Sequence, residues 1–132
     1  QIRDYLDETV KKAKEAGYVS TLFGRRRYVP ELNAKNKNLV AFGERVAMNT
    51  PIQGTAADII KKAMVDTDAA LKAAGMKARL ILQIHDELIV EAPEDEAERA
   101  AAILKEKMEN TVKLLVPLVA DAHIGKSWFD AK

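Results

Sequence analysis

The segment that decides the fold is Gln83-Ile84-His85-Asp86-Glu87-Leu88-Ile89-Val90-Glu91. A polar, ionisable triplet is preceded by the apolar residues Leu80, Ile81, Leu82 and Ile84 and followed by Leu88, Ile89 and Val90, and both flanks have the composition of β-strands. Two such runs joined by two or three residues predict a β-hairpin with the triplet at its tip. A carboxylate fixed at such a tip can bind a divalent cation without first ordering a loop. Asp86 is therefore the first candidate for a metal ligand.

The polar triplet by itself allows two interpretations. His-Asp-Glu at a turn is often only a solvated tip, and a lone histidine such as His85 is more often structural or solvent-facing than functional. If the tip does carry chemistry, strand alternation points Glu87 to the face opposite Asp86. Glu87 is then a weaker participant than Asp86.

The rest of the chain predicts a mixture of helices and strands. Ile2, Leu6 and Val10 recur at helical spacing before Gly17, which predicts a helix over 2–16. In chain order we then expect a hairpin from residues 18–23 and 26–29, a helix over 39–49, a helix over 50–74 that starts at a capping box in Thr50-Pro51-Ile52-Gln53, a last helix from Glu94, and a closing strand over 116–124. This order predicts an α+β fold, an antiparallel sheet with two hairpins and helices packed over one face.

Composition limits the kinds of protein that the chain can be. The 132 residues suffice for about one domain, and the absence of cysteine excludes disulfides and thiolate metal sites, which fits a reducing cytoplasm. No apolar run approaches the roughly 18 residues of a membrane span, so no membrane association is expected. Net charge is only +1, but residues 1–62 carry +5 and residues 63–132 carry −4. The first half is therefore the candidate for binding a polyanion, and the acidic half holds the candidate metal ligand.

Three polar residues in the first half share a helical spacing of four. If the backbone is helical through Pro51, Arg45, Asn49 and Gln53 present one stripe of hydrogen-bond donors, which could contact a nucleic-acid groove. The same residues also have ordinary structural interpretations. Gln53 could close a capping box, Asn49 could bond local backbone and Arg45 could pair with a nearby acid.

A run of three arginines follows Gly24. Alternation along a strand puts Arg25 and Arg27 on one face and Arg26 on the other, so the three cannot share one task. One or two of them could bind nucleic-acid phosphates, or their charges could simply protect an edge strand from pairing.

Together with its flanks, the hairpin segment resembles motif C in the palm of family A DNA polymerases, the bacterial DNA polymerase I family, in which a Gln-(Val/Ile)-His-Asp-Glu hairpin carries one catalytic aspartate. Thr21-Leu22-Phe23-Gly24-Arg25-Arg26-Arg27-Tyr28 resembles the arginine-rich hairpin of that family. Glu44-Arg45 and Asn49-Thr50-Pro51-Ile52-Gln53-Gly54-Thr55-Ala56-Ala57-Asp58 resemble its DNA-contacting segment. The three motifs follow one another in the family's order and span most of the chain.

The resemblance implies a palm-type sheet and a DNA-directed DNA polymerase that uses primer-template DNA and deoxynucleoside triphosphates. It implies that Asp86, with Glu87 as a lesser participant, is catalytic and that Asp86 binds Mg²⁺, one of two ions. It further implies that His85 contacts the primer terminus. The matching positions of the stripe touch the nascent base pair and the minor groove, and the arginine run binds DNA phosphates.

Family A polymerases also need a second catalytic aspartate, in motif A, and a fingers helix that grips the incoming nucleotide. Residues 1–132 contain neither segment. We therefore expect the C-terminal part of a polymerase domain, inactive alone, whose remaining N-terminal part is its partner. The alternative hypotheses are a non-catalytic DNA-binding module that keeps the arginine hairpin and the stripe, and a structural piece in which Asp86 is only solvated.

Overall fold

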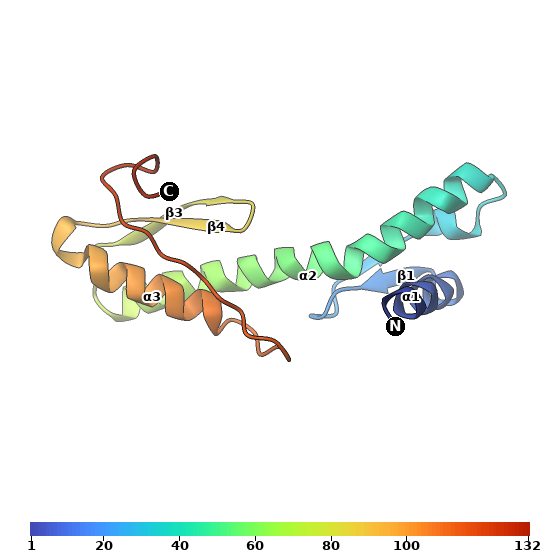
Figure 1. Ribbon diagram of the computed structural model, residues 1–132, viewed down its shortest axis with the longest axis horizontal. Helices are drawn as coiled ribbons and strands as arrows, with labels where there is room; N and C mark the ends of the chain where they lie inside the picture. Colours follow the sequence, from blue (N-terminus) through green and yellow to red (C-terminus); the bar gives the residue numbers. More distant parts are fainter. The chain divides into compact units, whose positions relative to one another are not determined.

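The computed structural model describes residues 1–132, in which helices and short strands follow one another (Figure 1). The chain divides into two compact units, Gln1–Asp58 and Ile59–Lys132. The α+β class and both predicted hairpins are confirmed, and each hairpin forms its own two-stranded antiparallel sheet. The elements are α1 (Ile2–Ala16), β1 (Tyr18–Ser20), β2 (Arg26–Tyr28), η1 (Pro30–Asn33), α2 (Lys37–Ala73), β3 (Arg79–Ile84), β4 (Glu87–Glu91), η2 (Glu94–Glu96) and α3 (Ala97–Glu109).

The first unit is organised around a small core under the β1–β2 hairpin. Gly17 ends α1 in the left-handed conformation, at φ 81°, and its N–H donates to the carbonyl of Ala13 over 2.8 Å. A glycine adopts this conformation without steric cost, so the chain can turn at once into β1. The buried core residues come from α1, the hairpin, η1 and α2: Ala13, Val19, Val29, Leu32 and Ala47.

The second unit is organised around the β3–β4 hairpin and α3. Its buried core consists of Leu71 from α2, Ala78 just before β3, and Ala100 from α3. The carboxylate of Glu96 accepts the backbone N–H groups of Lys77 and Ala78 over 2.9 and 3.0 Å. This contact fixes the start of β3 to η2, and it satisfies two backbone donors that precede the strand. The register of the hairpin shifts once, between Leu80 and Leu82 of β3.

The predicted break between two helices at Thr50 is wrong, because α2 is one helix that contains Pro51. A proline inside a helix removes one backbone hydrogen bond and crowds the preceding turn. Packing outweighs this local cost, since Ala47, four residues earlier, is fully buried in the first core. Neither α2, despite its length, nor any other helix is long and apolar enough to cross a membrane.

The predicted closing strand over 116–124 is also wrong, because no helix or strand follows Asn110. Val116 and Val119 are 67% and 70% exposed, so these apolar residues of the expected strand do not pack against a core. A strand needs a partner for its backbone groups, and Pro117 removes one donor from this segment. The apolar composition was therefore a misleading signal.

Candidate functional site

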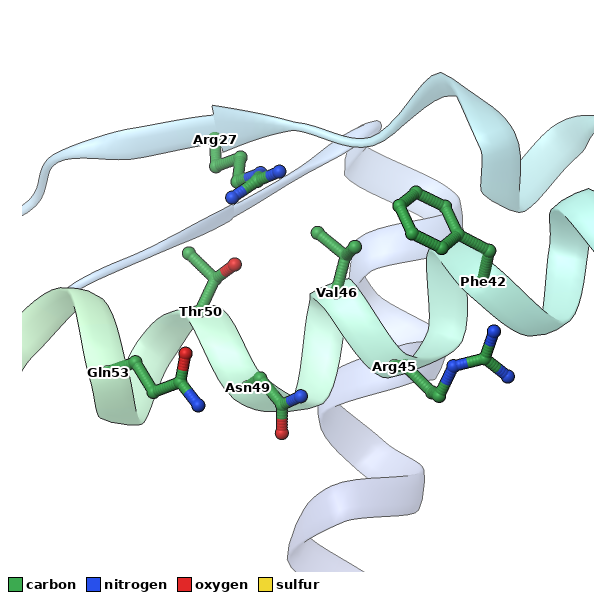
Figure 2. A pocket seen from close by; sticks show the side chains of 7 residues that line it. All are labelled: Arg27, Phe42, Arg45, Val46, Asn49, Thr50 and Gln53. Atoms are coloured by element: carbon green, nitrogen blue, oxygen red, sulfur yellow. The ribbon is translucent and has the colours of Figure 1, made fainter.

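One candidate site is a shallow groove on the first unit, about 270 Å³ in volume, between β2 and α2. Figure 2 shows Arg27 reaching from β2 toward the helix, with Arg45, Asn49 and Gln53 following one another along α2. The structure thus brings four of the predicted residues to one groove. Its lining is completed by three residues that the sequence analysis did not select: Phe42, Val46 and Thr50.

The continuity of α2 excludes one of the structural interpretations of the polar stripe. Gln53 cannot close a capping box, because no helix begins at Thr50. The acid next to Arg45, Glu44, pairs instead with Lys14 of α1 over 3.2 Å. Arg45, Asn49 and Gln53 are exposed and lie on one continuous helix, so their side chains are available to an external ligand.

The three arginines of the hairpin divide between two faces, as strand alternation predicts. Arg26 lies over the ring of Tyr18, its guanidinium carbon 4.4 Å from the ring centroid, and Tyr18 makes an edge-to-face contact with Tyr28. Arg25 and Arg27 both face α2, but they differ in what they contact. Arg27 lines the groove, whereas Arg25 precedes the strand and binds the helix directly.

Asp58 of α2 is the centre of a polar network that holds the loop of the hairpin. Its two carboxylate oxygens accept Nε of Arg25 over 2.8 Å and the hydroxyl of Thr21 over 2.6 Å. Arg25 also donates from Nη2 to the carbonyl of Gly54 over 3.3 Å. The Asp58 side chain is only 11% exposed, against 52% for Arg25. An exposed ion pair alone contributes up to about 1 kcal/mol, but removing the partners of a mostly buried carboxylate costs more, about 1–3 kcal/mol.

The same network brings the loop unusually close to the helix. The backbone N–H of Leu22 donates to the hydroxyl of Thr55 over 2.9 Å. A Cβ atom at Gly54 would lie 2.8 Å from the methyl group of Thr21, so only glycine permits this approach. The sequence analysis missed this contact surface. Its signal was the spacing of Gly54, Thr55 and Asp58, which places the three on one side of a helix.

A second candidate site is the turn of the β3–β4 hairpin in the second unit. Ile84 pairs with Glu87, so His85 and Asp86 form a two-residue loop, as the sequence predicts. His85 has a positive φ of 53°, a conformation that favours tight hairpin turns and that histidine tolerates better than most residues. The side-chain amide of Gln83 donates to the carbonyl of His85 over 2.7 Å and so braces the turn. The exposed Asp86 carboxylate is therefore carried on a short, internally bonded loop.

The chain does not contain a complete metal site. No group of three or more His, Cys, Asp or Glu side chains lies close enough together to hold an ion. A carboxylate is nevertheless the ligand type that Mg²⁺ prefers, and the solvent-exposed Asp86 fits the role of one ligand among several.

Comparison with known proteins identifies the family. The model of the family described as DNA polymerase family A matches residues 1–130. The chain belongs to DNA polymerase family A. Over 131 residues it is 54% identical to DNA polymerase I of Bacillus caldotenax and 55% identical to DNA polymerase I of Bacillus subtilis (strain 168). These alignments cover 99% of the chain, and the chain spans 15% of the length of either curated relative.

A solved structure supports the same conclusion at the level of the fold. It is described as the POL domain of Pol1 from M. smegmatis in complex with DNA primer-template and dNTP, and it superimposes with a TM-score of 0.95 at 47% identity. The match covers 98% of this chain and 23% of that polymerase chain. This family A chain thus has the fold of one segment of a polymerase domain.

Proposed function

We propose that this chain is part of a DNA-directed DNA polymerase, in which it supplies a primer-template surface and one metal-binding carboxylate. The observation that carries the proposal is the match to family A over residues 1–130, which includes every residue selected from the sequence. Two features of the structure support the proposal: the groove between β2 and α2 could bind DNA, and the braced turn at Asp86 could bind a metal ion.

The groove has the chemistry that sequence-independent DNA binding requires. Arg27 and Arg45 supply positive charge for phosphates, and Asn49 and Gln53 supply amides that both donate and accept hydrogen bonds. In the minor groove, every base pair presents acceptors at similar positions. Donors on a rigid helix can therefore test base-pair geometry without reading sequence, which suits a template-directed enzyme. Arg26 stays a prediction as a further phosphate ligand, whereas the guanidinium of Arg25 donates to Asp58 and to the carbonyl of Gly54.

The turn of the second hairpin is proposed as the catalytic contribution of the chain. Mg²⁺, held by Asp86 and by an aspartate outside this chain, would supply charge stabilisation and activation of the primer hydroxyl. The braced turn orients the Asp86 carboxylate before the substrate arrives, which removes an ordering cost from the reaction. His85, in the same turn, is proposed to contact the primer terminus, and Glu87 to assist Asp86.

The remaining part of the polymerase is the proposed protein partner. Large apolar side chains are exposed in both units. Leu115, Val116 and Phe129, for example, are 108%, 67% and 84% exposed. Such residues would be covered if the chain packs within a larger polymerase, consistent with its spanning 15% of its curated relatives.

The first prediction concerns the proposed metal ligand. In the full-length polymerase that contains this chain, Asp86→Ala should reduce primer extension with Mg²⁺ by about 1,000-fold or more, because a metal-binding carboxylate is lost, while primer-template affinity changes little. Asp95→Ala, which removes an exposed acid of η2 in the same unit, is the matched control and should extend normally. The isolated 132 residues should not extend a primer. Near-normal extension by Asp86→Ala would leave a non-catalytic DNA-binding module as the better description.

The second prediction concerns Arg27. Arg27→Ala should weaken primer-template binding to a similar degree for all sequences, and should make the slope of log affinity against log salt shallower by about one. Lys12→Ala removes the same charge from α1, where Lys12 pairs with Glu8, and should leave the slope unchanged. Equal slopes for wild type and Arg27→Ala would instead assign Arg27 to protection of an edge strand.

The third prediction concerns the polar stripe. Asn49→Ala and Gln53→Ala should each lower the efficiency of extension from matched primer termini by about tenfold. They should also reduce the ratio of this efficiency to the efficiency on mismatched termini, because groove contacts check base-pair geometry. Steady-state kinetics on both termini, with thermal unfolding as a control for folding, measure this. Unchanged discrimination in both variants would show that the stripe does not contact the primer-template.

A further inference from the structure

We propose that Asp58 is a positioning residue for DNA binding, and that Arg25 acts through Asp58 rather than on a phosphate. The inference rests on the proposed function, because its test measures the affinity of the polymerase for primer-template. Asp58 is bonded to both ends of the loop that separates β1 from β2, through Thr21 at one end and Arg25 at the other. The strand that follows this loop carries Arg27 to the groove.

The geometry explains why this contact would control Arg27. β2 has only three residues, and its strand pairing is with β1 alone. This pairing does not fix the distance between β2 and α2. Four hydrogen bonds cross from the loop to α2, made to Asp58 (two), Gly54 and Thr55. Gly54, Thr55 and Asp58 follow Gln53, the last residue of the stripe, within about one and a half turns of the same helix. The loop contacts therefore set where Arg27 stands relative to Arg45, Asn49 and Gln53.

Hydrogen bonding distinguishes Arg25 from its neighbours. Its guanidinium donates to Asp58 and to the carbonyl of Gly54, both within the protein. Thr21, only 5% exposed, donates its hydroxyl hydrogen to Asp58 and accepts the backbone N–H of Arg25 over 3.3 Å. Arg25 is thus tied to the helix by its side chain and to Thr21 by its backbone. Arg27 instead lines the groove.

The sign of the effect separates positioning from direct electrostatics. Asp58 is an acid close to a surface proposed to bind phosphates. If charge alone mattered, Asp58→Asn would remove repulsion and strengthen DNA binding. If Asp58 positions the hairpin, the same variant weakens DNA binding, because the charge-assisted bond to Arg25 is lost.

The experiment measures primer-template affinity as a function of salt in the full-length polymerase. We expect Asp58→Asn and Arg25→Ala each to weaken binding about tenfold, and Asp58→Asn to make the salt slope shallower by about one. In an Arg27→Ala background Asp58→Asn should have little further effect, because the residue that it positions is absent. A residue that only stabilises the fold would not show this dependence on Arg27.

A conservative pair keeps the test independent of gross misfolding. Thr21→Ser retains the hydroxyl and should bind like wild type, whereas the isosteric Thr21→Val removes the bond to Asp58 and should weaken binding as Asp58→Asn does. Tighter or unchanged binding by Asp58→Asn, while Arg27→Ala weakens it, would overturn the positioning role and leave the proposed function intact. If Arg27→Ala itself has no effect, the proposed DNA surface fails instead.

Discussion

Continuity of α2 through Pro51 is the constraint on which the rest of the structure depends. The helix supplies Ala47 to the first core and Leu71 to the second. From Arg45 onward it carries the polar stripe and then Asp58, the residue that holds the hairpin loop. A break at Thr50 would uncouple the stripe from Asp58, so the groove would lose its fixed geometry. One backbone hydrogen bond lost at proline is a small cost beside two buried contact surfaces.

The two hairpins use different means to fix polar side chains. The β1–β2 hairpin is short and depends on bonds to a neighbouring helix, with Asp58 as the common acceptor. The β3–β4 hairpin is braced within itself, by the pairing of Ile84 with Glu87 and by the amide of Gln83. In both cases the side chain that we propose to bind a ligand stays exposed while the backbone beneath it is held. This preorganisation is what binding of DNA phosphates and of a metal ion requires.

The sequence predicted those features that depend on local patterns. Alternating and helical spacing located α1 and both hairpins, and the two-residue turn at His85 and Asp86 followed from its apolar flanks. Features that depend on long-range packing were missed. The capping signal at Thr50 was overridden by burial on both sides of Pro51, and the apolar run over 116–124 found no strand to pair with. Asp58 was missed because its partners lie 33 and 37 residues away in sequence.

A structure of the full-length polymerase with primer-template, Mg²⁺ and a matched deoxynucleoside triphosphate tests the account most directly. The account predicts Arg27, Arg45, Asn49 and Gln53 within about 3.5 Å of DNA polar atoms, and the Asp86 carboxylate bound to the metal. It also predicts that Arg25 stays bonded to Asp58 in that complex. DNA running over the Arg26 and Tyr28 face of the hairpin, with the groove between β2 and α2 empty, would contradict it.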